Sequence, residues 1–386
     1  MKLSTDRILT THVGSLPRPQ ALFEKLVAQD RGEAVDRAEM DATVAAAVAA
    51  TVRDQCGAGI DIVGDGEMGK ASYTHYVKHR LSNVVSARDG GPSARARIPR
   101  DMAEHPDLMA AGGGGRGTAR NLLAPLVCAG PVRYTDKAPV ARDIANLRAA
   151  AAAHAPSDLF LTSASPGTLA HFIRNEHYAS EDAFLSDLAE AMAAEYEAIH
   201  TAGIVVQIDC PDLAMSRHIT YQDISDREFL RIVDRNIAAL NHATRNIPPS
   251  AMRMHVCWGN YPGPHTHDMP VAQLFAPLAK ARPRAILFEA ANPRHHHEWE
   301  DWRAARLPDD LVLIPGALDT TTNLVEHPRL IAQTLRHFAD IVGRERVIAG
   351  TDCGFGTVAG RDVVAPSVVL AKLRALAEGA RLASAQ

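Results

Sequence analysis

The sequence predicts a (β/α)8 barrel of the TIM type, and three observations support this fold. Eight short runs rich in β-branched residues recur along the 386 residues. The runs are continuously apolar rather than alternating, which is typical of strands buried on both faces of a parallel sheet. Most are followed by a helical pattern, and repeated strand-then-helix units favour a barrel. The predicted strands are residues 8–13, 60–64, 158–162, 204–208, 252–256, 285–288, 311–314 and 346–349.

Start and stop signals mark the helices between these strands. Ser180 is a predicted N-cap for a helix whose apolar face includes Phe184, and Gly203 is predicted to end it. Pro328 suits the first turn of a later helix, and Gly343 suits the position just after its last residue.

The regular alternation of strands and helices stops between about residues 78 and 137, which we interpret as an insertion after the second strand. Extended runs that begin at Asn83 and Leu126 predict a hairpin, and the glycines at 112–115 predict a mobile loop. The insertion is either surface decoration or a lid over the barrel mouth. With this insertion, residues 1–386 are predicted to form a single barrel domain.

Composition excludes several classes of partner. The net charge is −4 and no stretch is strongly basic, so nucleic-acid binding has no electrostatic footprint. No segment reaches the ~18 to 20 uninterrupted apolar residues of a membrane helix. The N-terminus lacks the apolar core of a signal peptide, which predicts a cytoplasmic protein. Five scattered cysteines suit metal ligands and core thiols rather than a disulfide framework.

Four residues near the ends of three of the last four predicted strands predict a zinc site. His255 and Cys257 are two residues apart at the end of one strand, so their side chains point the same way. Glu289 follows the next strand and Cys353 follows the last one. One imidazole, one carboxylate and two thiolates suit Zn²⁺ far better than Mg²⁺ or Ca²⁺. The alternative is that the histidine and both cysteines are ordinary core residues.

The charge of this ligand set indicates the type of chemistry. Three anionic ligands would leave zinc at a net charge of −1, which is poor for polarising water but favourable for holding a reactive sulfur. A thiol that coordinates zinc loses its proton. The sequence therefore predicts alkyl transfer to a substrate thiol rather than hydrolysis.

Short motifs follow one another along the chain in a recognisable order. They are Thr11-His-Val-Gly-Ser-Leu-Pro, Gly64-Asp-Gly-Glu67, Gln207-Ile-Asp209 with Pro211, His255-x-Cys257, Glu289, and Asp352-Cys353-Gly354. Over residues 8 to 380 they resemble the C-terminal, zinc-bearing barrel of cobalamin-independent methionine synthase.

The resemblance implies a role for each of these positions. By this resemblance, zinc is bound by His255, Cys257, Glu289 and Cys353. The backbone at Gly14 and Ser15 would hold the carboxylate of homocysteine, and Glu67 and Asp209 would receive its ammonium group. The residues themselves agree, because both acids follow buried strands and two neighbouring carboxylates need a cation or a shared proton. The alternative is that these acids bind helix N-termini or a nearby arginine.

The chain also departs from the methionine synthase pattern. Thr321 stands where that family has a histidine proposed as proton donor, and residues 162–166 lack its pterin-stacking tryptophan. The runs 322–328 and 350–355 look closer to a branch that includes the epoxyalkane:coenzyme M transferases. Arg18, Arg294 and the histidines 295–297 could bind an anionic thiol or a second anionic substrate, although a run of three histidines is more often a solvated surface feature.

The leading hypothesis is a zinc-dependent thiol alkyltransferase that resembles methionine synthase, with homocysteine as first candidate thiol and a small molecule as methyl donor. Epoxide opening by the thiolate of coenzyme M is the alternative within the same chemistry. A decarboxylase resembling uroporphyrinogen decarboxylase shares the barrel but needs no metal. A non-catalytic zinc module would have a closed site without an exchangeable ligand.

Overall fold

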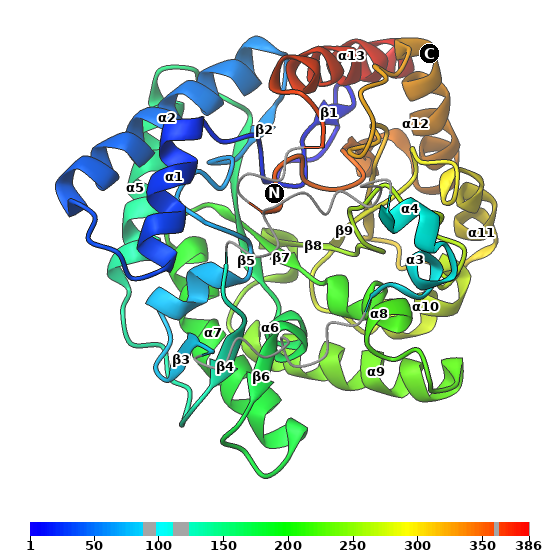
Figure 1. Ribbon diagram of the computed structural model, residues 1–386. Helices are drawn as coiled ribbons and strands as arrows, with labels where there is room; N and C mark the ends of the chain where they lie inside the picture. The colour runs from blue at the N-terminus through cyan, green and yellow to red at the C-terminus, as the bar shows by residue number, and fades with distance from the viewer. Residues whose placement is uncertain (88–97, 111–122, 359–362, 386) are drawn as a thin grey trace.

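Eight parallel strands form the centre of the molecule (Figure 1). The computed structural model describes residues 1–87, 98–110, 123–358 and 363–385. Six strands form one sheet in the order β10-β9-β8-β7-β5-β2, and β1 pairs with β11. Their bounds are β1 Leu9–Thr10, β2 Ile62–Val63, β5 Asp158–Ala164, β7 Val205–Asp209, β8 Met252–His255, β9 Ala285–Phe288, β10 Val312–Pro315 and β11 Ile348–Ala349.

Backbone contacts join the two sheets on both sides. Parallel bridges link β10 to β11 at Leu313 with Val347 and at Gly316 with Gly350. On the other side, the N–H of Asp61 donates to the carbonyl of Thr10 next to β1 and β2. The eight strands therefore close on themselves, which confirms the predicted barrel and all eight predicted strand positions.

Helices surround the strands, as Figure 1 shows. Both predicted helix signals are confirmed: the Ser180 hydroxyl caps α7 by accepting from the N–H of Ala183, and Gly343 follows α12 with a φ of 88°. The helices are α1 Gln20–Asp30, α2 Arg37–Gly57, α3 Arg100–Glu104, α4 Pro106–Ala110, α5 Ala138–Ala152, α6 Pro166–Phe172, α7 Glu181–Thr201, α8 Ser216–Ile219, α9 Asp226–Ala243, α10 Val271–Leu278, α11 Trp299–Ala304, α12 Pro328–Val342 and α13 Pro366–Ser384.

The insertion after β2 contains the predicted hairpin. Strand β3 (Val84–Ser86) pairs antiparallel with β4 (Leu126–Cys128). A third strand, β6 (Ile173–Asn175), pairs parallel with β4 and was not predicted. It follows the short helix α6, so the hairpin is attached to the segment after β5. The predicted glycine loop at 112–115 lies outside the described residues.

Apolar side chains fill the barrel interior, and one charged side chain lies among them. A buried cluster inside the barrel includes Phe160, Leu287 and Ile314. The guanidinium of Arg253, from β8, lies 3.7 Å from the centre of the Phe160 ring. Among the described residues, none of the helices has the length and apolar character that a membrane crossing requires.

Candidate metal and substrate site

Three of the four predicted metal ligands come together at the carboxyl ends of the strands. His255 ends β8, Cys257 follows it, and Cys353 lies in the turn after β11. One ligand atom from each lies within 4.8 Å of the other two, and all three residues are buried. Within the described part of the chain, this is the only such group of three or more His, Cys, Asp or Glu residues.

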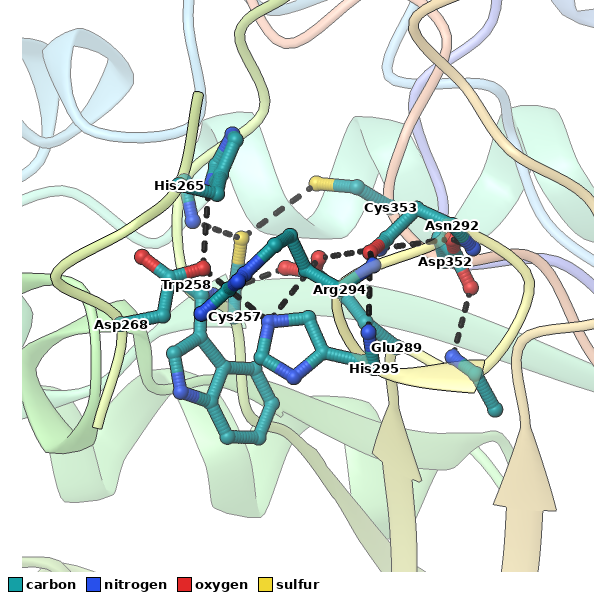
Figure 2. A network of polar contacts seen from close by, with 12 residues as sticks. Cys257, Trp258, His265, Asp268, Glu289, Asn292, Arg294, His295, Asp352 and Cys353 are labelled. Carbon is teal, nitrogen blue, oxygen red and sulfur yellow. Dashed lines mark hydrogen bonds and ion pairs between the residues drawn. The ribbon is translucent and has the colours of Figure 1, made fainter. Parts of the chain in front are cut away.

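The spacing of the sulfurs fits a zinc ion. The sulfur atoms of Cys257 and Cys353 are 3.7 Å apart (Figure 2). Two sulfurs at about 2.3 Å from a tetrahedral zinc would be separated by about 3.8 Å. One imidazole nitrogen and two thiol sulfurs are also the donor types that zinc prefers. The residues present therefore fit the ion that the sequence predicts.

Glu289, the fourth predicted ligand, stays outside this group. Its Oε1 accepts a hydrogen bond of 2.8 Å from the backbone N–H of Trp258, and its Oε2 accepts one of 2.8 Å from the side chain of Asn292. Asp352 supports the same loop, because its carboxylate accepts from the backbone N–H groups of Ala290, Ala291 and Asn292. These bonds hold the Glu289 loop beside Cys353 without placing the Glu289 carboxylate among the ligand atoms.

The contacts among these residues shift the pKa values of two of them. The hydrogen bond with Cys353, together with burial, raises the pKa of Cys257 well above its ordinary value. Burial works against a charge on His255, but Asp209 and Cys257 outweigh it and raise the His255 pKa to about 10. A metal ion would supply this missing positive charge and would keep the thiols deprotonated.

The predicted ammonium-binding acids lie at the ends of the two strands that flank β5. Glu67 follows β2 and Asp209 ends β7, and both are buried. Burial raises the pKa of Glu67 and the charge of Asp209 raises it further, whereas Lys70 and Arg18 lower it. Oε1 of Glu67 accepts a 2.7 Å hydrogen bond from the hydroxyl of Thr162. Oε2 is 3.6 Å from the Arg18 guanidinium and has no hydrogen-bond partner among the described residues.

Asp209 lies between the predicted zinc ligands and the predicted substrate-binding residues. Its Oδ1 lies 3.6 Å from Nδ1 of His255 and accepts a 2.8 Å hydrogen bond from the side chain of Gln207. A residue predicted to bind the substrate therefore lies beside one predicted to bind zinc. The alternative that the acids pair with an arginine applies only to Glu67, which has Arg18 next to it.

The predicted carboxylate-binding turn approaches the same region. Gly14 has a φ of 151°, and a Cβ there would lie 2.5 Å from Cγ2 of Thr162 and 3.6 Å from Oε1 of Glu67. A side chain at this position would therefore collide with Thr162, whose hydroxyl donates to Glu67. Among the described residues, the backbone N–H groups of Gly14 and Ser15 have no hydrogen-bond partner.

Sequence reasoning missed a buried network of histidines beside Glu289. The carboxylate of Asp268 lies 2.8 Å from Nδ1 of His265 and 3.0 Å from Nε2 of His295 (Figure 2). His295 also lies 2.8 Å from Glu298 and 4.0 Å from Glu289. Burial lowers the pKa of His295, but Asp268 and Glu298 outweigh it and raise this pKa to about 11. His295 is 3% exposed, so the surface interpretation of the histidine run is wrong for this residue.

The insertion contacts the loop that follows the Cys257 ligand. Asp101, on α3, is 1% exposed and accepts hydrogen bonds from the Tyr261 hydroxyl and from the backbone N–H of His265. No local pattern around Asp101 indicated this contact. Thr321, in place of the family's histidine, bonds its own turn through a 2.8 Å hydrogen bond to Asp319.

Comparisons with known proteins agree with this fold. No family model matches the chain. The chain is 24% identical over 383 residues to a methionine synthase from Saccharolobus islandicus. The alignment covers 97% of this chain and 94% of that protein. A methionine synthase from Sulfolobus acidocaldarius is 24% identical over 348 residues, covering 89% of this chain and 85% of that protein.

A solved structure shows the same fold. The B12-independent methionine synthase of a Shewanella species, in complex with selenomethionine, has a TM-score of 0.72 and 21% identity, and 97% of each chain is covered. These likenesses confirm the barrel. The similar proteins described here carry the name methionine synthase, and the likeness to the coenzyme M branch stays a prediction.

Proposed function

We propose that this protein is a zinc-dependent methyltransferase that acts on the thiol of an amino acid, with homocysteine as the first candidate. The observation that carries this proposal is the 3.6 Å approach of Asp209 to His255. This approach supports a carboxylate proposed to bind ammonium next to sulfur and nitrogen atoms proposed to bind zinc, as a short amino-acid thiol would require. The full-length similarity to proteins named methionine synthase supports the same reaction.

In this proposal His255, Cys257 and Cys353 hold the zinc ion, and Glu289 is a weaker fourth ligand that reaches it from the loop after β9. Zinc would supply the positive charge that keeps the substrate thiol deprotonated and nucleophilic at neutral pH. Trp258 and Asn292 hold Glu289 by hydrogen bonds, so this carboxylate would need a small movement to reach the ion.

The chain's own residues would orient the rest of the substrate. Oε2 of Glu67, which has no hydrogen-bond partner among the described residues but lies 3.6 Å from Arg18, would accept the ammonium group together with the carboxylate of Asp209. The free N–H groups of Gly14 and Ser15 would donate to the carboxylate. With the ammonium and carboxylate groups of the amino acid held in this way, its thiol side chain would extend toward the metal ligands.

A small-molecule methyl donor would enter from the open side of the metal group. We further propose that the described part of the insertion, which includes α3, lies over this side as part of a single barrel domain. The contact of Asp101 with the loop after β8 supports this arrangement. Thr321 lies in the corresponding loop after β10 and brings no ionisable group to assist the donor.

Calorimetry on the zinc-loaded protein tests the proposal. We expect homocysteine to bind at least about tenfold more tightly than coenzyme M, because a sulfonate is repelled by the two carboxylates. Homocysteine should release a proton on binding, measured in buffers of different ionisation enthalpy, and methionine, which has no thiol, should not. Tighter binding of coenzyme M would favour epoxide opening instead. A protein that retains no zinc would contradict the proposal and favour a metal-free lyase.

A further inference from the structure

Arg253 is a charged residue that is fully buried inside the barrel, next to the candidate site. It lies on β8 two residues before His255, and its exposure is 0%. Its hydrogen bonds go to neutral oxygens: 2.8 Å from Nε to Oε1 of Gln207, 2.9 Å to the Thr11 hydroxyl and 3.0 Å to the carbonyl of His12. No carboxylate among the described residues accepts a hydrogen bond from this guanidinium.

A charge in such a place is costly for the fold. Removing an ion from water carries a penalty that good hydrogen bonds repay only in part, and apolar residues of similar volume often serve a core as well or better. Burial lowers the pKa of Arg253 to about 9, against the attraction of Asp209 and Asp158. The stacking on Phe160 offsets part of the penalty. The position of Arg253 therefore calls for a role other than packing.

The contact with Gln207 indicates that the guanidinium sets the orientation of the Gln207 amide. A side-chain amide has one accepting end and one donating end, and a guanidinium only donates. Arg253 therefore fixes the oxygen of the Gln207 amide toward itself. The amide nitrogen must then face the opposite side, where it donates to Oδ1 of Asp209 at 2.8 Å and to the carbonyl of Val13.

Both acceptors of that nitrogen belong to the amino-acid end of the site. Val13 directly precedes the Gly14 turn, and Asp209 is one of the two proposed ammonium-binding residues. Oδ1 of Asp209 is occupied by Gln207 and lies beside His255, whereas Oδ2 has no hydrogen-bond partner among the described residues. The orientation of the amide thus leaves one defined carboxylate oxygen for the substrate.

We propose that Arg253 is a positioning residue for amino-acid recognition: it fixes the Gln207 amide, which holds Asp209 and the Val13–Gly14 segment in the geometry that binds the ammonium and carboxylate groups. The proposal rests on the proposed function, because it assumes an amino-acid substrate. It does not involve the metal, so it can be tested on metal-free protein.

The test is the selectivity of metal-free protein between methionine and the analogue of methionine that lacks the amino group, measured by calorimetry. In Gln207→Glu the new carboxylate still pairs with Arg253, which keeps the buried charge satisfied. Its second oxygen meets Oδ1 of Asp209 and the Val13 carbonyl, so the two carboxyl groups must repel each other or share a proton, and either outcome weakens ammonium binding by Asp209. We expect the preference for methionine to fall by about tenfold or more, which corresponds to one charge-assisted hydrogen bond. Arg253→Met should lower the same preference, because the amide is then free to turn.

Thr11→Val is the matched control. It removes one hydrogen bond of Arg253 but leaves Gln207 in place, so it should lower Tm without changing the selectivity. A role in folding alone would lower Tm in all three variants and leave the preference for methionine intact, which would overturn the proposal. If Arg253→Met does not fold, the selectivity of Gln207→Glu alone tests the proposal. Wild-type protein without any preference for methionine would instead contradict the proposed function.

Discussion

The metal end and the amino-acid end of the candidate site lie side by side but are built in different ways. At the metal end, the sulfurs of Cys257 and Cys353 are 3.7 Å apart and the hydrogen bond between them raises the pKa of Cys257. At the amino-acid end, Glu67 has Arg18 at 3.6 Å, and Asp209 is bonded to Gln207, which Arg253 holds in turn.

The difference shows which end depends on a ligand. Cys257 has its pKa raised by the hydrogen bond with Cys353 and by burial, so a bound metal ion would favour its thiolate. The carboxylates already have protein partners and can stay in position without a substrate. We therefore expect loss of one of the three clustered ligands to remove function, whereas changes at the amino-acid end should alter affinity and selectivity. A change at Glu289, which lies outside the cluster, should have the smallest effect.

The largest effect is expected for Cys353→Ala. Loss of one thiolate should lower metal affinity and activity by at least about 100-fold, since even partners outside the ligand set cost 10- to 100-fold. Zinc content by elemental analysis and methyl transfer to homocysteine measure the effect. Cys128→Ala is the control, because Cys128 is buried in the β3–β4 hairpin and bonds the carbonyl of Gly130. Full zinc occupancy and activity in Cys353→Ala would show that both ends are independent of this thiol.

An intermediate effect is expected for Glu67→Gln and Asp209→Asn. Each removes a charge-assisted hydrogen bond of about 1.5 to 3 kcal/mol to the ammonium group, so homocysteine should bind roughly 10- to 150-fold more weakly. The desamino analogue of homocysteine should be affected far less. Equal losses for both thiols would indicate damage to the barrel rather than loss of ammonium recognition.

Acid should imitate the Glu67 substitution. Because the pKa of Glu67 is raised, this carboxyl becomes neutral at a higher pH than an exposed glutamate. Its attraction for the ammonium group is present above that pKa and is lost as the pH falls through it. Homocysteine affinity of the wild type should thus decline on acidification, and the decline should be smaller in Glu67→Gln. The same decline in both proteins would assign it to another group.

The smallest effect is expected for Glu289→Gln. Its carboxylate is held outside the ligand group, so the variant should retain zinc with an affinity about tenfold lower. A competition titration with a chelator measures this loss. A decrease as large as that of Cys353→Ala would show that Glu289 is a full ligand and that the metal end has four equal protein donors.

Local patterns were sufficient for much of this molecule. The eight apolar runs predicted the eight barrel strands, because strands of a parallel sheet are buried on both faces and need no partner to be recognised. The i, i+2 spacing of His255 and Cys257 predicted that their side chains would point the same way. Glycine and serine signals marked the ends of α7 and α12 for similar local reasons.

Other features became visible only in three dimensions. Asp101 reaches Tyr261 across 160 positions of sequence, and Arg253 reaches Thr11 across 242. His295 belongs to a run expected at the surface, yet it is 3% exposed and contacts Asp268 and Glu298. Glu289 was expected among the ligands, and its hydrogen bonds to Trp258 and Asn292 hold it beside them instead.

The sequence by itself determined the strands, the ends of two helices and which residue types stand at the strand ends, because these follow from burial, backbone preference and side-chain chemistry within a few residues. The tertiary structure decided which of those side chains meet, which oxygen of Asp209 is left for a ligand, and which charges are paired. Those outcomes depend on distances between segments far apart in the chain, and on the cost of leaving a buried polar group without a partner.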